Sequence, residues 1–313
     1  VLPVVATMGF NLEYSESDLT WAPSEWSWVG PMYSVLFPSM YYGKPILSYH
    51  SESTFDSREA FRLIEKYGVT FSLLPPTAIR MMMKVDEPGA KYDLSSMRVV
   101  ESGGGFVGEE LKDWVKKEFE GAVIHQAYGQ TEVTGPIMEV SKLFDLKEGT
   151  LGRPTIGYEV AIVDRETAEK TVEPGEIGEI AVRYQGNPAC FEEYWNKPEK
   201  TAQKVRNGWC LTEDLGSVDE EGYFTFHGRK DDVIMCAGYK VGPEEVEDSL
   251  TSHSKVDAAG VIGIPDEKRG EIPKAFVVLG DGEHGSAKLK EDLQLYVKDN
   301  LAKYEYPREI EFM

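Results

Sequence analysis

The stretch Ala122-Val-Ile-His-Gln-Ala-Tyr-Gly-Gln-Thr-Glu132 decides the fold class, because an expected strand ends there in a polar, glycine-containing turn. We predict the strand over 122–128. Directly upstream, apolar residues at helical spacing predict a helix over 108–119. Its apolar face carries Leu111, Trp114, Val115 and Phe119. A helix that leads into a strand is part of a βαβ unit, so the stretch indicates an α/β fold.

The same alternation continues toward the N-terminus. The elements expected there are helices over 56–66 and 77–85 and strands over 69–74 and 98–100. Gly68 is a typical stop signal for the first of these helices. Alternating strands and helices predict parallel α/β layers, and ligands bind at the carboxyl edge of such a sheet. The loops to inspect are therefore those after Val100 and after Ala127.

The character of the sequence changes near residue 147. Strand-like runs over 159–163 and 179–183 are separated by turn residues such as Glu173-Pro-Gly-Glu176, which predicts a small β-barrel subdomain. A small α+β unit is expected afterwards, with helices over 243–252 and 287–301 and strands over 258–264 and 275–279. We therefore expect an α/β subdomain over 1–146, a β-rich subdomain over 147–230 and a small α+β domain over 231–313.

Charge and cysteine content limit the function classes. The 313-residue chain carries 33 basic and 54 acidic side chains, and its net charge of −21 argues against a nucleic-acid or anionic-membrane partner. No apolar run is long enough for a membrane-spanning helix. Cys190, Cys210 and Cys236 lack the spacing of a zinc site or a disulfide framework. An odd number of thiols suits a reducing cytoplasm, which is the location we expect.

The turn after Ala127 carries side chains that suit a bound nucleotide. Thr131 can donate to a phosphate oxygen, and Glu132 can hold a magnesium ion that neutralises phosphate charge. Tyr128 offers a flat face to a purine, and Gly129 lets a ligand approach the backbone closely. The alternative is an ordinary turn with a threonine helix cap.

Three further segments are candidates for ligand contact. The run Ser102-Gly-Gly-Gly-Phe106 leaves main-chain groups open to a base or phosphate, or is a flexible turn. Asp214, at an expected strand end, can accept both hydroxyls of a ribose, and Arg229 offers a fork of donors. Both also fit a solvated hairpin. The run Cys236-Ala-Gly-Tyr-Lys-Val-Gly-Pro-Glu-Glu-Val246 is a tight turn before a well-capped helix, and it can line a tunnel.

Taken together and in this order, the motifs resemble the adenylate-forming superfamily, and within it the AMP-forming acyl-CoA synthetases of acetyl and medium-chain type. The resemblance covers essentially the whole chain. The motifs that carry it are Tyr128-Gly-Gln-Thr-Glu132, Thr212-Glu-Asp-Leu-Gly216, Gly228-Arg-Lys-Asp-Asp232, Gly238-Tyr-Lys-Val-Gly-Pro-Glu-Glu-Val-Glu247, Gly263-Ile-Pro-Asp266, Arg269-Gly270, Lys274-Ala-Phe-Val277 and Tyr306-Pro-Arg308.

The resemblance implies a reaction of a carboxylic acid with magnesium ATP to an acyl-adenylate, followed by transfer of the acyl group to CoA with release of AMP. It makes Thr131, Glu132 and Lys240 the catalytic residues, Glu132 the magnesium ligand and Asp231 the hinge of the small domain. The residues that it implies for binding nucleotide, pantetheine and the CoA phosphates are Gly103, Gly104, Gly105, Gln126, Ala127, Tyr128, Gly129, Gln130, Thr131, Asp214 and Arg229, then Gly238 and Tyr239, then Arg269 and Arg308.

Some positions depart from the family pattern. Glu213 stands where a glycine is usual, and Lys240 where an arginine is usual. Acetate-specific relatives carry a tryptophan at the position of Gly129, so we expect a short- or medium-chain acid instead of acetate. Trp28 either forms a wall of the acyl pocket or packs in a core.

Two parts of the family pattern do not fall within the chain. The phosphate loop is expected before Val1, and the lysine that assists adenylation is expected shortly after Phe312. We therefore expect a piece of a longer enzyme that has little or no activity by itself. Two alternatives remain, namely an adenylation domain that loads a carrier protein and a non-catalytic AMP- or CoA-binding remnant. The sequence does not indicate the oligomeric state.

Overall fold

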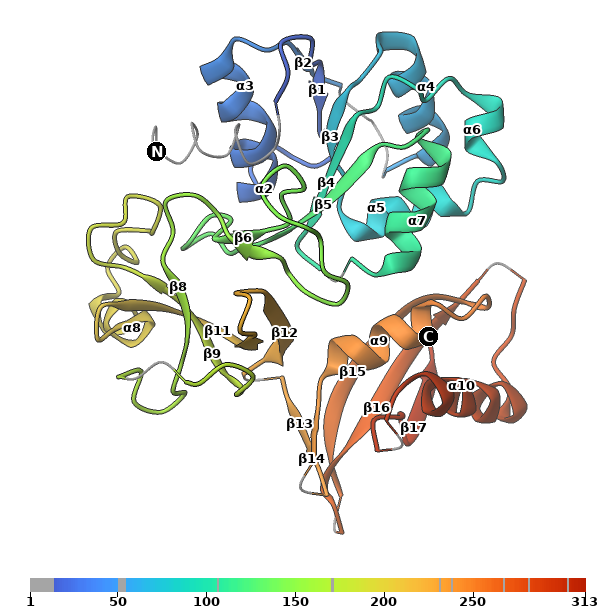
Figure 1. The fold of residues 1–313 in the computed structure, drawn as a ribbon. Coiled ribbons are helices and arrows are strands. Elements are labelled where there is room, and N and C mark those ends of the chain that lie inside the picture. Colours follow the sequence, from blue (N-terminus) through green and yellow to red (C-terminus); the bar gives the residue numbers. More distant parts are fainter. Residues whose placement is uncertain are drawn as a thin grey trace. The chain divides into compact units, whose positions relative to one another are not determined.

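The structure, a computed structural model, describes residues 14–49, 55–105, 107–169, 172–230, 232–237, 239–266, 268–280, 282–302 and 304–313. The chain divides into two compact units (Figure 1). The first comprises Val1–Thr212 and Ser217–Thr225, and the second comprises Glu213–Gly216 and Phe226–Met313. Within the described ranges, every helix is too short or too polar to span a bilayer.

The first unit contains a sheet with the strand order β2-β1-β3-β4-β5-β6-β7. Its members are β1 (Thr20–Trp21), β2 (Ile46–Leu47), β3 (Phe71–Leu73), β4 (Val99–Gly103), β5 (Val123–Tyr128), β6 (Ile137–Met138) and β7 (Arg153–Pro154). Strands β1 to β5 pair in parallel, whereas β6 and β7 join antiparallel. The parallel α/β layer expected from the sequence is confirmed, although β4 extends beyond its expected end at Val100.

Helices lie on both sides of this sheet (Figure 1). One side carries α4 (Ser57–Tyr67), α5 (Pro76–Met83), the single turn α6 (Pro88–Lys91) and α7 (Glu109–Glu118), and the other carries α2 (Val29–Pro31), the π-helical turn η1 (Met32–Leu36) and α3 (Phe37–Tyr42). Helix α4 begins at Asp56, whose carboxylate accepts from the N–H groups of Arg58 and Glu59, and ends at Gly68 with φ +67°. These local signals made α4 predictable. The helical run 29–42 was not predicted.

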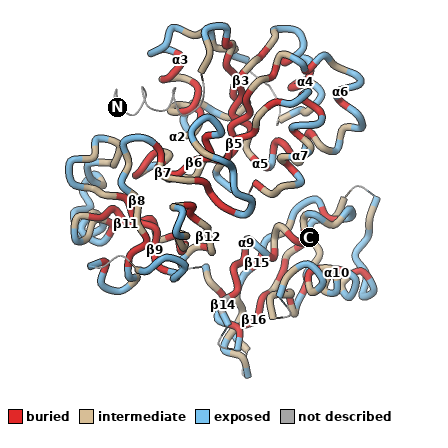
Figure 2. Tube along the Cα trace, in the orientation of Figure 1, coloured by how far each residue is buried: buried red, intermediate tan, exposed pale blue. Residues whose placement is uncertain are grey.

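Alternate residues of the strands feed two apolar cores. Val100 and Ile124 pack with Phe61 beneath α4 and α7, whereas Val99 and Phe71 belong to the core on the opposite face. Figure 2 shows the resulting buried stretches along β3 and β5. Because both faces of the sheet are covered, polar side chains that must contact solvent or a ligand are expected at the ends of the strands.

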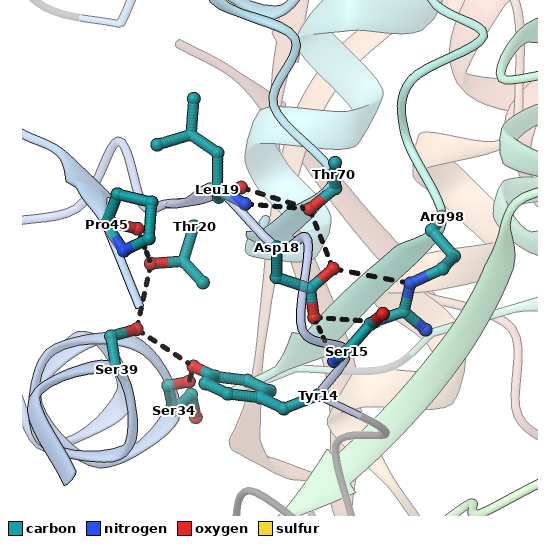
Figure 3. A network of polar contacts seen from close by, with 10 residues as sticks. All are labelled: Tyr14, Ser15, Asp18, Leu19, Thr20, Ser34, Ser39, Pro45, Thr70 and Arg98. Atoms are coloured by element: carbon teal, nitrogen blue, oxygen red, sulfur yellow. Dashed lines mark hydrogen bonds and ion pairs between the residues drawn. The ribbon is translucent and has the colours of Figure 1, made fainter. Parts of the chain in front are cut away.

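A buried ion pair fixes the amino edge of the sheet (Figure 3). The fully buried carboxylate of Asp18 lies 2.8 Å from Nη2 of Arg98, and Oγ1 of Thr70 donates to it at 2.8 Å. Arg98 directly precedes β4, and Thr70 directly precedes β3. A buried charge needs such partners, so the network holds the three strand starts together. The loops that carry candidate site residues lie at the opposite, carboxyl edge of the sheet.

The β-rich region that follows is built on the strand order β10-β11-β9-β8, with β12 pairing with β11. Its elements are β8 (Val160–Val163), β9 (Gly178–Arg183), α8 (Pro198–Lys204), β10 (Val205–Arg206), β11 (Trp209–Val218) and β12 (Phe224–Arg229). Helix α8 was not predicted. The division between the two units passes through β11 and β12, so each of these strands contributes residues to both.

In its described residues, the remainder of the second unit is an α+β sandwich of one sheet and two helices. The sheet has the order β14-β13-β16-β15, with β17 pairing with β16. Its elements are β13 (Ile234–Cys236), β14 (Tyr239–Val241), α9 (Pro243–Thr251), β15 (Val256–Asp266), β16 (Gly270–Leu279), α10 (Ala287–Asn300) and β17 (Glu309–Phe312). Leu250 from α9 and Leu293 from α10 pack on Val277 in one core. The predicted α+β character of this region is confirmed.

Candidate functional site

Strand β5 carries the polar turn to the carboxyl edge of the sheet, beside the end of β4. Gly103 pairs there with Ala127. A Cβ atom on Gly103 would lie 2.4 Å from the carbonyl oxygen of Ala127, so only glycine permits this strand spacing. The expectation that Gly103 belongs to a loop is wrong, because pairing with β5 extends β4 through it. Gly104, with φ +78°, begins the turn.

The main chain of Gln126 is held by a buried ion pair. Its N–H donates to Oε2 of Glu139 at 2.9 Å, and its carbonyl accepts from the N–H of Glu139 at 2.9 Å. The other carboxylate oxygen of Glu139 lies 2.7 Å from Nζ of Lys112. The last residues of β5 therefore have a fixed path before the turn begins.

The turn 130–132 is bound to a segment far along the chain. The hydroxyl of Tyr194 donates to Oε1 of Glu132, and the N–H of Phe191 donates to the carbonyl of Glu132 at 2.7 Å. Nε2 of Gln130 donates to the carbonyl of Thr212 at 2.6 Å. Thr131 stands between these two anchored residues with its side chain exposed. An exposed hydroxyl beside an oriented carboxylate is an arrangement that suits contact with a phosphate and its counter-ion.

The donor set at this turn fits magnesium. The described part of the chain has no group of three or more His, Cys, Asp or Glu side chains placed to hold a metal ion. Proteins bind magnesium through one or two carboxylates together with substrate phosphates and water, instead of through a complete protein cage. The partly exposed carboxylate of Glu132, already oriented by Tyr194, meets that requirement.

A second cluster of sequence-predicted residues lies in the other unit. Nη1 of Arg229 is 3.1 Å from Oδ1 of the buried Asp214, and Nη2 is 3.3 Å from Oε2 of Glu213. Asp214 was expected at a strand end but lies inside β11. Glu213 has φ +66°, a left-handed conformation that lets both carboxylates reach the same guanidinium. The structure therefore brings Asp214 and Arg229 together and adds Glu213 to them.

The residues predicted for pantetheine and CoA are described only in part. Gly238 and Asp231 lie outside the described residues, as does the side chain of Lys240. The ring of Tyr239 stacks on Tyr304 with centroids 4.4 Å apart. Tyr304 was not predicted, and only its nearness in sequence to Tyr306-Pro-Arg308 points toward it.

Two arginines were predicted to contact CoA phosphates. Nη1 of Arg269 lies 3.9 Å from Oδ1 of Asp266. Nη1 of Arg308 donates to the hydroxyl of Tyr306 at 2.8 Å, and Lys298 lies over the same ring at 3.8 Å from its centroid. Arg308 and Lys298 thus form a small basic and aromatic group in an acidic chain.

The two residues predicted for the acyl pocket lie in different surroundings. Trp28 is 67% exposed, so the view that it packs in a core is wrong. A Cβ atom on Gly129 would lie 2.5 Å from the backbone nitrogen of Gly135. The direction of a side chain at 129 is thus filled by the neighbouring turn. A tryptophan at this position needs a different local backbone, so the missing indole does not by itself leave a cavity.

Three ionisable groups near the site have shifted pKa values, one glutamate and two cysteines. Glu101, in β4, is fully buried and accepts from the hydroxyl of Ser34 at 2.8 Å, and burial raises the pKa of its carboxyl to about 8. Cys190 and Cys210 hydrogen-bond through their thiols, which lowers the pKa of Cys190, whereas the same contact and burial raise that of Cys210. Cys190 directly precedes Phe191, whose N–H binds Glu132.

Comparison with known proteins identifies the class. Residues 4–195 match the model of the AMP-binding enzymes, and residues 245–313 match the model of the C-terminal domain of these enzymes. The chain therefore belongs to the AMP-binding enzyme family.

The individual relatives of the chain include acetyl- and acyl-coenzyme A synthetases. An acetyl-coenzyme A synthetase of Bacillus subtilis is 40% identical over 96% of this chain and 52% of its own length, and a mitochondrial acyl-coenzyme A synthetase of Mus musculus is 34% identical over 97% and 52%. The chain spans about half the length of the curated relatives it matches.

Solved structures agree with this family. An anthranilate CoA ligase in complex with anthranoyl-AMP has a TM-score of 0.86 at 29% identity, and covers 99% of this chain and 59% of its own. An o-succinylbenzoate CoA synthetase of Bacillus subtilis with its acyl-adenylate intermediate has a TM-score of 0.83 at 27% identity, and covers 100% of this chain and 60% of its own.

Proposed function

We propose that the protein is an AMP-forming acyl-CoA synthetase that activates a short- or medium-chain carboxylic acid with ATP and then transfers the acyl group to CoA. The observation that carries this proposal is the turn 130–132, in which an exposed hydroxyl and an oriented carboxylate stand at the carboxyl edge of a parallel sheet. The relatives named as acyl-CoA and acetyl-CoA synthetases support it.

In the first unit, the nucleotide is bound beside β4 and β5. Tyr128 stacks on adenine, and the main chain of Gly103 to Gly105 and of Gln126 and Ala127 surrounds the base. Gly129 contacts the nucleotide through its main chain, since Gly135 fills the space of a side chain there, and Gln130 anchors the turn to Thr212. Thr131 donates to the α-phosphate, and Glu132 holds the magnesium ion.

In the second unit, Asp214 accepts the ribose hydroxyls, and Arg229 lies beside it at 3.1 Å. Asp231 serves as the hinge, Gly238 and Tyr239 line the pantetheine path, and Lys240 contributes a catalytic cation. Arg269 and Arg308 take the CoA phosphates, for which a guanidinium fork is suited.

The reaction explains the use of ATP. A thioester cannot form spontaneously from a carboxylate. The acid is therefore first joined to the α-phosphate as a mixed anhydride, while the bond between the α- and β-phosphates breaks and pyrophosphate leaves. Magnesium, when bound, neutralises charge on the phosphates. The protein's own task is to hold the attacking carboxylate and the α-phosphate in line and to place donors where charge develops. Thr131 can supply such a donor.

The test is pyrophosphate release by the full-length protein with ATP and acids of increasing chain length. The assay buffer contains a reductant, because we propose that the protein works in the reducing cytoplasm. The assay tests the expectation of an acid longer than acetate, which rests on the sequence pattern at Gly129 alone, and acetate as the best substrate would overturn it. Addition of CoA should convert the adenylate to acyl-CoA and AMP. Adenylate that forms but is transferred only to a carrier protein would contradict the CoA step, and a protein that binds AMP without releasing pyrophosphate would contradict the whole proposal.

A further inference from the structure

The segment 191–204, which comprises the loop before α8 and α8 itself, contacts each end of the turn 130–132. Two of its residues bind Glu132 and one binds Gln130. These contacts join positions more than 55 residues apart in sequence, and all of them lie within the first unit. We propose that this segment is a clamp that sets the direction of the Glu132 carboxylate, with Tyr194 and Lys204 as positioning residues.

Tyr194 acts on the carboxylate directly. Its hydroxyl donates to Oε1 of Glu132 and leaves the other oxygen unengaged by it. The terminal torsion of a glutamate side chain is broad, so without a partner the carboxylate samples many orientations. A hydrogen bond from a hydroxyl to a carboxylate is charge-assisted and therefore directional. Tyr194 thus selects one orientation before any ligand arrives.

The Tyr194 ring is anchored independently of its hydroxyl. It packs on Phe191 with centroids 4.8 Å apart, and the N–H of Phe191 fixes the main chain of Glu132. The packing of the two rings therefore holds the loop in place, whereas the hydroxyl of Tyr194 binds the carboxylate of Glu132. Removing the hydroxyl and keeping the ring separates positioning from packing.

Lys204 secures the other end of the turn. Only 6% of Lys204 is exposed, and its Nζ lies 3.3 Å from Oε1 of Gln130 and 3.5 Å from the carbonyl of Thr212. A lysine is rarely buried so deeply unless its charge is hydrogen-bonded. The amide of Gln130 also donates to the carbonyl of Thr212, so the side chain is held against β11 from two directions.

The inference rests on the proposed function, in which Glu132 holds the magnesium of magnesium ATP. Partners that orient a metal ligand change metal affinity by about 10- to 100-fold when they are removed. A role in folding alone would change thermal stability without changing the magnesium requirement. The two possibilities are therefore separated by measuring magnesium and nucleotide binding instead of turnover.

The experiment uses the full-length protein and its Tyr194→Phe, Lys204→Met and Glu132→Gln variants. Binding of a fluorescent ATP analogue is titrated with Mg²⁺ and repeated in EDTA, and thermal unfolding is followed without nucleotide. Tyr184→Phe is the matched control, because the hydroxyl of Tyr184 donates to the carbonyl of Glu192 at 2.6 Å in the same loop and does not bind Glu132.

We expect Tyr194→Phe to raise the Mg²⁺ concentration for half-maximal binding by about 10-fold and to leave binding in EDTA and the melting temperature nearly unchanged. Lys204→Met should raise it by a smaller factor, and Tyr184→Phe should not change it. A wild-type magnesium requirement in Tyr194→Phe, or an equal rise in Tyr184→Phe, overturns the clamp. If Glu132→Gln itself leaves the requirement unchanged, the proposed role of Glu132 fails, and the clamp fails with it.

Discussion

Glu213 adopts a left-handed backbone conformation, with φ +66°, and its carboxylate lies 3.3 Å from the guanidinium of Arg229. The two carboxylates of Glu213 and Asp214 thus share one cation. Only glycine takes up this conformation at no steric cost, and for other residues the cost is about 1–2 kcal/mol.

We therefore expect Glu213→Gly to raise the free energy of unfolding by about 1 kcal/mol. The lost ion pair offsets little of this gain, because both side chains are well exposed. Urea denaturation of Glu213→Gly and Glu213→Gln measures the two effects. The glutamine variant keeps the backbone strain and removes the charge, so a glycine variant less stable than the glutamine variant would contradict the strain argument.

The same variants address nucleotide binding. Glu213 is one of the acidic groups around Arg229, and its removal takes a negative charge away from a predicted ribose and phosphate contact. Both variants should bind ATP more tightly than the wild type, by about 2- to 5-fold at low ionic strength. Isothermal titration measures this, and an unchanged or weaker affinity in both would show that Glu213 does not act through its charge.

Glu101 gives the stability a pH dependence. The folded state raises the pKa of its carboxyl from 4.5 to about 8, so the folded state binds the proton more tightly than the unfolded chain. The resulting stabilisation is fully present below pH 4.5 and is lost as pH rises through about 8, at up to about 1.4 kcal/mol per unit.

The Glu101→Gln variant has no ionisable group at this position and therefore loses the pH-dependent stabilisation, but it keeps an acceptor for the hydroxyl of Ser34. Thermal unfolding at pH 6 and at pH 9 should show a larger loss of stability in the wild type than in the variant. Parallel curves for the two proteins would contradict a buried, protonated Glu101.

Gly129 is expected to be intolerant of a side chain. A Cβ atom there would lie 2.5 Å from the nitrogen of Gly135, so Gly129→Ala should lower the unfolding free energy by about 1–3 kcal/mol. Gly105→Ala is a matched control, because its nearest contact, Cγ of Pro76, lies at an ordinary 3.7 Å. Equal stabilities for the two variants in urea would be incompatible with the close approach of these turns.

Cys190 should be the reactive thiol. It is partly exposed and its pKa is lowered by the thiol of Cys210, whereas Cys210 and Cys236 are buried. Because the thiolate is the nucleophile, brief treatment with iodoacetamide should modify Cys190 first. Peptide mass spectrometry locates the label, with Cys190→Ser as the control. Earlier labelling of Cys236 would disprove this order.

The sequence predicted the elements whose signals are local. Helix α4 has its cap at Asp56 and its stop at Gly68, and the strand that ends at Tyr128 follows an amphipathic helix. Helix α8 and the extension of β4 through Gly103 were missed, because pairing and packing with distant segments decide them. Gly103 joins a strand only because β5 lies alongside it.

The candidate site follows the same division. Thr131 and Glu132 were placed correctly after a strand, since their motif is contiguous in sequence. Tyr194 and Lys204 were not found, because nothing near them in the chain indicates that they reach the turn 130–132. The inclusion of Asp214 in β11 was also missed, since a glutamate with positive φ inside a strand has no sequence signal of its own.

The passage of β11 through both units bears on how such enzymes are recombined. Glu213–Gly216 belong with Phe226–Met313, although Ser217–Thr225 return to the first unit. A hybrid that exchanges everything after residue 231 would combine Asp214 and Arg229 from one parent with the rest of the second unit from the other parent. A hybrid cut between them would pair an aspartate and an arginine that were never selected together. An exchange of the second unit between two such enzymes should therefore transfer Glu213–Gly216 together with Phe226–Met313, as two separate inserts.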